Sequence, residues 1–161
     1  MIGSIYLATP VGMDVGRAEY LQRSLAYKFC GGRTNAVHLA SKVFEAKFTE
    51  MGSWDAYINH VAKGVDFAFR LPTFSIICCV QPTLGRATAQ IVERALVTKR
   101  QVCLIQEDEG LLSLSKVSGV ETTDDTDWKN GWRIHHSPPF LEWRHNETGS
   151  DPRTTHPTDA G

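Results

Sequence analysis

The chain lacks the patterns that would assign it at once to a membrane or secreted class. Its 161 residues contain no run of about 18 consecutive apolar residues, which is the length that a membrane-spanning helix needs. The first residues, MIGSIYLATP, have no basic stretch followed by a long apolar core, so we expect no secretory signal. The sequence therefore predicts a cytoplasmic protein that has no contact with a membrane.

Neither sign of charge is in excess. The chain has 17 Lys and Arg residues against 18 Asp and Glu residues, which gives a formal net charge of −1. Proteins that bind nucleic acid usually carry a basic surface, so this balance argues against a nucleic-acid partner. A small anionic ligand needs only one or two local cations and remains compatible with the composition.

Cysteine and histidine occur without the spacings of a metal site. The chain has four cysteines, of which Cys78 and Cys79 are adjacent, and it has no C-x-x-C pair. Neighbouring residues of a strand point to opposite faces, so we expect these thiols to act as small buried hydrophobic groups in a reducing compartment. His135 and His136 would also point apart. The sequence therefore predicts no metal and no cofactor.

Strand and helix patterns alternate through the first half of the chain. Residues 2–8 form a short β-branched and aromatic run that reads as a strand. Asp14 can then cap a helix over 15–29, where apolar residues recur at helical spacing. Residues 34–50 fit a helix in part and a strand in part, and Ser53 can cap a further helix.

A unit of strand, turn, helix and strand follows. Residues 74–80, FSIICCV, are almost all apolar, as expected for a parallel strand that is covered on both faces. Gly85 then opens a helix that ends near Arg100, and residues 101–106 form a second buried strand. Such βαβ units join parallel strands by a right-handed crossover. The pattern predicts an α/β fold, a three-layer sandwich with a mainly parallel, Rossmann-like central sheet.

The composition changes after the second buried strand. Residues 107–130 are acidic and are expected to form loops, whereas 131–136 can form an edge strand. The remaining residues are rich in Pro, Thr, Asp and Gly, which is typical of poorly ordered segments. We therefore predict an α/β domain over 1–136 and a flexible C-terminal tail over 137–161.

The turn that precedes the helix at Gly85 is the main candidate site. In an open parallel sheet, ligands bind beyond the carboxyl ends of the strands, where helices begin with unpaired N–H groups and a partial positive charge. Gly85 allows close approach of an anion, Arg86 can add a bidentate cation, and Thr88 can add a hydroxyl. The sequence has neither G-x-G-x-x-G nor a Walker A motif, so an ordinary turn with a solvated Arg86 is the alternative. Arg17, expected at the same edge, can pair with a phosphate.

Three segments together resemble the nucleoside 2-deoxyribosyltransferase-like superfamily. They are IYLATP at 5–10, the apolar strand at 74–80, and GRATAQIVERALVTKRQVCLI at 85–105. Members of the family begin with a strand close to IYLAGP and later carry a helix start G-T/S-x-x-E-x-G-x-A, followed by GKPV and a strand. In this sequence Thr9 replaces the usual glycine, and residues 99–102 (KRQV) replace GKPV.

The resemblance implies chemistry at an N-glycosidic bond. The family's nucleophile is a glutamate in the first turns of this helix, and a tyrosine at the position of Tyr6 orients it. No alignment of this sequence places a glutamate there, because Ala89, Gln90 and Ile91 occupy the positions. Glu93, one turn further along, is the nearest carboxylate.

Two functions therefore stay open. One is a nucleotide N-glycosidase or deoxyribosyltransferase-like enzyme with Glu93 and Tyr6 as catalytic residues. The other is a non-catalytic protein that binds or sequesters a nucleotide, nucleoside or ADP-ribose-like signal, and a purely structural module without a ligand is a third alternative. The resemblance also implies a homo-oligomer. The residues expected at the ligand are Thr9, Pro10, Asp14, Arg17, Gly85, Arg86, Ala87, Thr88 and Gln90.

Overall fold

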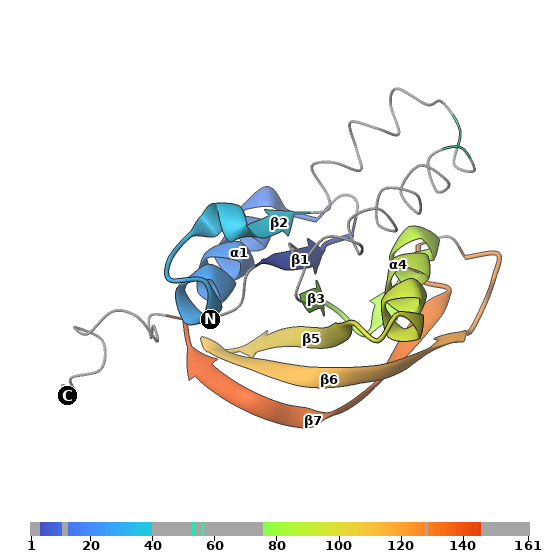
Figure 1. Ribbon diagram of the computed structural model, residues 1–161. Helices are drawn as coiled ribbons and strands as arrows, with labels where there is room; N and C mark the ends of the chain where they lie inside the picture. Colours follow the sequence, from blue (N-terminus) through green and yellow to red (C-terminus); the bar gives the residue numbers. More distant parts are fainter. Residues whose placement is uncertain are drawn as a thin grey trace.

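Seven strands form one mixed sheet in the described part of the chain, and two α-helices pack against it (Figure 1). The computed structural model describes residues 4–10, 13–39, 53, 56, 76–127 and 129–145. Along the sheet the strand order is β2-β1-β3-β5-β6-β7-β4. The strands are β1 (Ile5–Ala8), β2 (Val37–Leu39), β3 (Ile76–Cys79), β4 (Thr83–Leu84), β5 (Gln101–Asp108), β6 (Leu111–Thr122) and β7 (Trp132–Arg144), and the helical elements are α1 (Val15–Phe29), the 3₁₀ turn η1 (Thr34–Ala36) and α4 (Arg86–Val97).

The strands β2, β1, β3 and β5 run parallel to one another. Ile5 of β1 lies opposite Val37 of β2 and Ile76 of β3, and Ile76 lies opposite Gln101 of β5. Because β1 lies between β2 and β3, the direction in which the chain adds strands reverses between β1 and β3. That reversal is the topological switch point of doubly wound α/β sheets.

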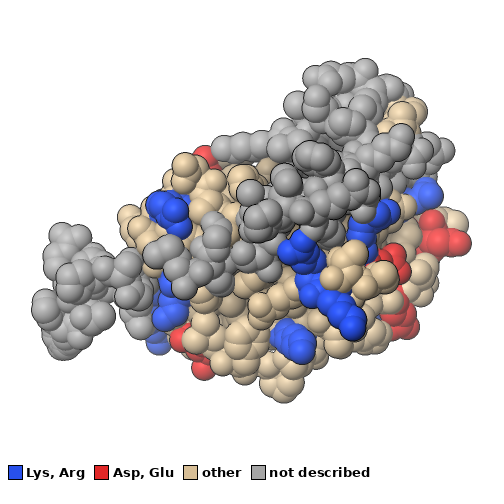
Figure 2. Space-filling view, in the orientation of Figure 1, with Lys and Arg blue, Asp and Glu red and all other residues tan. Residues whose placement is uncertain are grey.

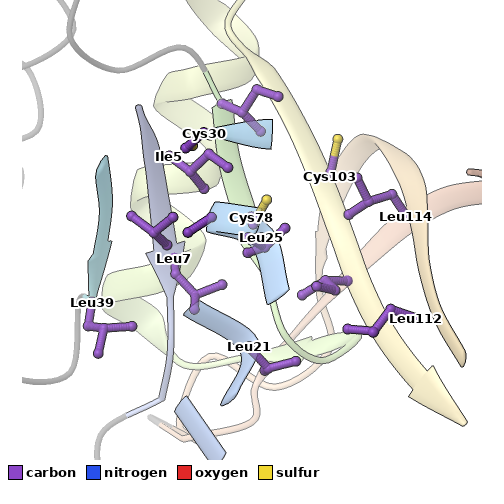
Figure 3. Close-up of a cluster of buried hydrophobic side chains, with 14 of the residues drawn as sticks. Ile5, Leu7, Leu21, Leu25, Cys30, Leu39, Cys78, Cys103, Leu112 and Leu114 are labelled. Atoms are coloured by element: carbon purple, nitrogen blue, oxygen red, sulfur yellow. The ribbon is translucent and has the colours of Figure 1, made fainter. Parts of the chain in front are cut away.

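The two helices cover opposite faces of these strands. Alternate residues of β3 and β5 face α1, where Leu21 and Leu25 pack among them (Figure 3). The residues in between face α4, where they meet Ile91 and Val92. Burial on both faces explains why β3, with the sequence IICC, is apolar throughout. The predicted α/β class is confirmed.

The second half of the sheet is antiparallel. β5 and β6 are joined by a two-residue turn, Glu109 and Gly110, whose φ angles of 51° and 83° are both positive, as in type I′ hairpins. β7 then pairs antiparallel with β6, and β4 pairs antiparallel with the start of β7. Antiparallel residue pairs outnumber parallel ones, so the prediction of a mainly parallel sheet is wrong.

The C-terminal part of the sheet also corrects two predicted boundaries. The segment 107–130, predicted as loops, contains the end of β5 and all of β6. The predicted edge strand 131–136 is only the beginning of β7, which has a neighbour on each side at Trp132 and Arg133. The predicted boundary between 136 and 137 therefore lies inside a strand, and 137–144 belong to the sheet.

Two prolines within β7 account for the misplaced boundary. Pro138 and Pro139 have no N–H to donate, and proline inside a sheet is confined to edges and irregular positions. The pairing of β6 with β7 shifts register between Leu114 and Gly119. At this irregularity the amide of Lys116 donates to the hydroxyl of Ser137 at 3.0 Å. A side chain thus replaces the regular ladder contact opposite the prolines.

The N-terminal predictions agree closely with the structure. The predicted helix 15–29 is α1, and β1 lies within the predicted strand 2–8. The ambiguous segment 34–50 begins as η1 and β2, and its remainder lies outside the described residues. Ser53 accepts a hydrogen bond from the Ala56 amide at 3.2 Å, as a helix cap does. No helix in the described ranges is long and apolar enough to cross a membrane.

The end of α4 provides a test of the backbone geometry. The amides of Lys99 and Arg100 donate to the carbonyls of Leu96 and Ala95, which is the hydrogen-bond pair of a Schellman cap. Lys99 has a φ of 62°, in the left-handed region that favours glycine. We expect Lys99→Gly to raise the free energy of unfolding by about 0.5–1 kcal/mol.

Val97→Gly is the matched control, because Val97 is 80% exposed and still inside the helix. This change should lower the free energy of unfolding by about 1 kcal/mol or less. Urea denaturation measures both variants. Destabilisation by both glycines would contradict the left-handed cap.

Candidate functional site

The carboxyl ends of β1 and β3 lie side by side at the switch point. Ala8, the last residue of β1, is in register with Cys79, the last residue of β3. The chain continues from β1 into α1 and from β3 through β4 into α4. Ligands of open α/β sheets bind beyond these strand ends. The helix α1 follows β1 at this edge, whereas Gly85 and α4 follow β4, which pairs with the start of β7.

The start of α1 is neutralised by its own cap. Asp14 is the N-cap residue, and its Oδ2 atom accepts a hydrogen bond of 2.9 Å from the amide of Arg17. The prediction that Asp14 caps this helix is confirmed. A carboxylate here opposes the partial positive charge of the helix end, so the start of α1 is poorly suited to bind an anion.

The start of α4 has no such side chain. Its N-cap is Gly85, which makes no side-chain cap hydrogen bond, and its first turn contains no acidic residue. Gly85 has φ −80° and ψ 172°, an extended conformation that any residue can adopt. The contribution of this glycine is therefore the missing side chain and not an unusual backbone angle. The helix end keeps its partial positive charge.

The remaining predicted residues of the α4 start have mixed surroundings. Thr88 is 8% exposed and Ala87 packs against the core beneath α4, so their side chains contribute to helix packing. Arg86 and Gln90 are half-buried, and Arg86 has an interaction partner within the protein. The groups at this turn that suit an anion are thus the first amides of the helix and the Arg86 guanidinium.

The residues after β1 form the other part of the edge. Thr9 is fully buried, and its amide donates to the carbonyl of Leu7 at 3.0 Å. Pro10 is half-buried, and its carbonyl accepts from the amide of Met13 at 3.1 Å. Tyr6 packs on the face of the sheet that α4 covers. The turn that leaves β1 is therefore held by its own backbone hydrogen bonds.

Glu93 lies away from this edge. It is exposed, and it lies about 12 Å along the helix axis from Gly85, at about 1.5 Å per residue. The residues of α4 that face the sheet are Thr88, Ala89, Ile91, Val92 and Ala95. A catalytic role of Glu93 stays a prediction, and its position in α4 does not favour that role.

Arg17 is already engaged within the protein. Its Nη1 atom lies 2.5 Å from Oε1 of Glu107, and its guanidinium carbon lies 5.4 Å from the centre of the Tyr20 ring. The prediction that Arg17 pairs with a phosphate is not supported, because a carboxylate from β5 occupies the guanidinium. Local sequence gave no sign of this partner.

A polar cluster between α1 and the ends of β5 and β7 was missed entirely by sequence reasoning. The Tyr20 hydroxyl donates to Oε2 of Glu107 at 2.9 Å, and the Tyr20 ring stacks on His145 with 4.1 Å between ring centres. Ser24 is hydrogen-bonded to His145. We call this set the α1 cluster, and its members are Arg17, Tyr20, Ser24, Glu107 and His145. Strand alternation from Cys103 and Ile105 would have placed Glu107 on the α1 face, had β5 been extended beyond residue 106.

Hydrogen bonds in the α1 cluster favour the ionised carboxylate. The bond from Arg17, and then that from Tyr20, lower the pKa of Glu107, while burial acts in the opposite direction. Burial and the neighbouring carboxylate of Glu107 raise the pKa of Tyr20. Glu107 therefore stays ionised and Tyr20 protonated at neutral pH. Because both carboxylate oxygens have partners, the cluster mainly fastens the β5–β6 hairpin to α1.

We expect Glu107→Gln to lower the free energy of unfolding at pH 7 by about 1 kcal/mol, the upper range for a partly exposed pair. The lowered pKa means that the stabilisation is present above the ordinary value of 4.5 and is lost as the pH falls through the folded-state value. Urea denaturation at pH 7 and pH 3 checks both statements. The difference in the free energy of unfolding between wild type and Glu107→Gln should be smaller at pH 3 than at pH 7.

Glu109→Gln is the control for this prediction, since Glu109 is an exposed carboxylate in the adjacent turn. It should change stability little at either pH. The ion pair would be contradicted if wild type had a higher free energy of unfolding than Glu107→Gln by the same amount at pH 3 and pH 7.

The thiols offer no chemistry at these sites. All four cysteines are buried and unbridged, as the sequence predicts for cysteines that act as hydrophobic groups. Burial raises the pKa of Cys79 to about 12 and that of Cys103 to about 11, so both stay protonated. Among the described residues, no group of three or more His, Cys, Asp or Glu side chains could hold a metal ion.

Both signs of charge occur on the face of the molecule that Figure 2 shows, as the balanced composition implies. Comparison of the chain with protein-family models, with curated proteins and with solved structures finds no match. The resemblance to the deoxyribosyltransferase-like superfamily therefore stays a prediction from sequence motifs. The fold itself defines an α/β protein whose parallel half has a switch point.

Proposed function

We propose that the protein binds a nucleotide, nucleoside or ADP-ribose-like molecule at the carboxyl ends of β1 and β3. One observation carries the proposal. Of the two helices that follow β1 and β3 along the chain, α1 is capped by the Asp14 carboxylate, whereas α4 starts at Gly85 without a capping side chain. The amides of Arg86, Ala87 and Thr88 would receive the anionic group of the ligand.

The remainder of the ligand would extend from α4 toward the turn after β1. Thr9 and Pro10 follow β1 directly and would form the opposing wall, since β1 and β3 are neighbours in the sheet. Gln90 lies about one turn along α4 and has an amide that can hydrogen-bond a sugar hydroxyl or a base. Arg86 would add charge by exchanging its present contact for the ligand.

Cleavage at an N-glycosidic bond would require a carboxylate beside the anomeric carbon. Glu93 is exposed and lies two turns into α4, which favours the alternative function, a protein that binds or sequesters the molecule without turnover. If the protein is an enzyme, the resemblance implies that Glu93 and Tyr6 take part.

A binding assay with two variants that both supply a helix cap but differ in charge tests the proposal. Gly85→Asp would give α4 the same cap that Asp14 gives α1, and Gly85→Ser would give a neutral cap. For nucleoside monophosphates and ADP-ribose, we expect calorimetry to show at least tenfold weaker binding to the aspartate variant than to the serine variant. A tenfold change corresponds to about 1.4 kcal/mol.

Equal binding to both variants, or no binding of any compound to the wild type, would overturn the proposal. Analysis of the incubated compounds separates the two functions, because free base indicates a glycosidase and intact compound indicates a binder. If free base forms, Glu93→Gln should abolish its formation. Undiminished turnover would remove Glu93 from the mechanism.

A further inference from the structure

His145 connects three elements of the fold at the end of β7. Its backbone amide donates to the carbonyl of Gly110 in the β5–β6 turn at 3.3 Å. Its ring stacks on Tyr20 of α1, with 23° between the ring planes, and Nδ1 is hydrogen-bonded to Ser24 of α1. His145 thus links the end of β7 and the hairpin turn to one side of α1, next to the Glu107 contacts of the α1 cluster.

We assign the ring hydrogen of neutral His145 to Nδ1 from the hydrogen bonds of Ser24. The Ser24 hydroxyl is fully buried and donates its one hydrogen to the carbonyl of Tyr20 at 2.9 Å. Toward His145 the same oxygen can therefore only accept, so Nδ1 carries the hydrogen and donates it. A proton taken up in acid must then bind at Nε2, which has no hydrogen-bond partner among the described residues.

The charged groups around the ring do not compensate the positive charge that protonation of His145 would add. Arg17 and Arg23 approach from α1, Arg144 precedes His145 in β7, and Glu107 approaches from β5. Burial and then Arg23 lower the pKa of His145, and Glu107 opposes them only in part. Glu107 is already engaged by Arg17 and Tyr20.

We propose that His145 is an acid-sensitive latch that holds the end of β7 and the β5–β6 turn on α1. In the neutral state the ring stacks on Tyr20 and donates to Ser24. Protonation of Nε2 places a poorly compensated charge in this contact, and His145 separates from α1 and from the Gly110 carbonyl, while Trp143 stays in the core. This device is independent of the ligand site at Gly85.

The direction of the pH dependence follows from linkage. The histidine binds a proton less readily in the latched state than after release, where its pKa returns to the ordinary value of 6.5. The latch is therefore at full strength above about pH 6.5 and weakens as the pH falls toward the latched-state value. Each pKa unit between the two states raises the opening constant about tenfold in acid.

Two measurements on the whole chain test the latch. NMR titration should give His145 a pKa below 6.5, and hydrogen exchange should show that its backbone amide opens more often at pH 5 than at pH 7.5. After correction for intrinsic exchange rates, the increase should not exceed the factor that the measured pKa difference sets.

Two histidine variants provide the comparison. His145→Asn keeps an N–H donor for Ser24 but cannot titrate, so the acid-induced opening should disappear. His136→Asn removes an exposed histidine of the same strand and should leave the opening unchanged. The proposal is overturned if wild-type His145 titrates at or above 6.5. It is also overturned if acid leaves its amide protected, or if His145→Asn opens in acid as wild type does.

Discussion

Trp143→Ala is expected to lower the free energy of unfolding by about 3–5 kcal/mol. Trp143 is 2% exposed, and its ring meets Phe29 of α1 edge-on with 5.7 Å between ring centres. It lies in the core between α1 and the sheet, together with Leu112 and Leu114 of β6. Removal of the indole would leave a large cavity in that core. Urea denaturation followed by circular dichroism measures the loss.

Two variants of the same strand are the controls. Trp143→Phe should cost less than half as much, because most of the apolar contact remains and the buried Nε1 has no hydrogen-bond partner in the described residues. Phe140→Ala should change stability by about 0.5 kcal/mol or less, since Phe140 is 54% exposed. A flexible tail over 137–161 would instead make all three variants nearly equal to wild type.

Gly131→Ala is expected to be the second large effect, a loss of about 2 kcal/mol or more. A Cβ atom at Gly131 would lie 2.0 Å from the carbonyl oxygen of Asp124 and 2.5 Å from that of Asp127. These are backbone atoms of the loop between β6 and β7. The Gly131 amide donates to Asp127 at 2.8 Å, and its carbonyl accepts from Thr123 at 2.8 Å. An added methyl group would break the contacts that close this loop.

Gly119→Ala is the matched control in the preceding strand. The nearest atom to a Cβ at Gly119 is Cδ2 of His135 at 3.8 Å, an ordinary van der Waals contact. This change should be close to neutral or slightly stabilising, because alanine loses less backbone entropy than glycine on folding. If thermal unfolding shows that Gly131→Ala and Gly119→Ala lose equal stability, the close contact between residue 131 and the carbonyls of Asp124 and Asp127 is wrong.

The parallel half of the fold could be predicted because its signals are local. Asp14 caps the helix that follows it, and the apolar runs around β3 and β5 are typical of strands that are buried on both faces. The antiparallel half could not be predicted, because polar residues and prolines interrupt the apolar pattern of its strands. β6 and β7 carry acidic, serine and proline residues at positions that face solvent or lie at the register shifts.

The candidate sites also divide into one that local sequence predicts and one that depends on contacts between distant segments. The Gly85 turn is predicted from residues adjacent in the sequence, and in the structure it directly follows β4, which pairs with the start of β7. Arg17 was assigned to a phosphate because its partner could not be foreseen. Glu107 becomes its neighbour only when β5 extends past residue 106 and brings the carboxylate over α1. Contacts between such distant segments have no local signature.

We propose that the start of α4, and not that of α1, receives an anion. An ¹H–¹⁵N NMR titration with adenosine 5′-monophosphate tests it most directly. We expect saturable shifts of the amides of Arg86, Ala87, Thr88 and Thr9, with little change at Arg17. Shifts centred on the start of α1, or a spectrum that the nucleotide leaves unchanged, would contradict it.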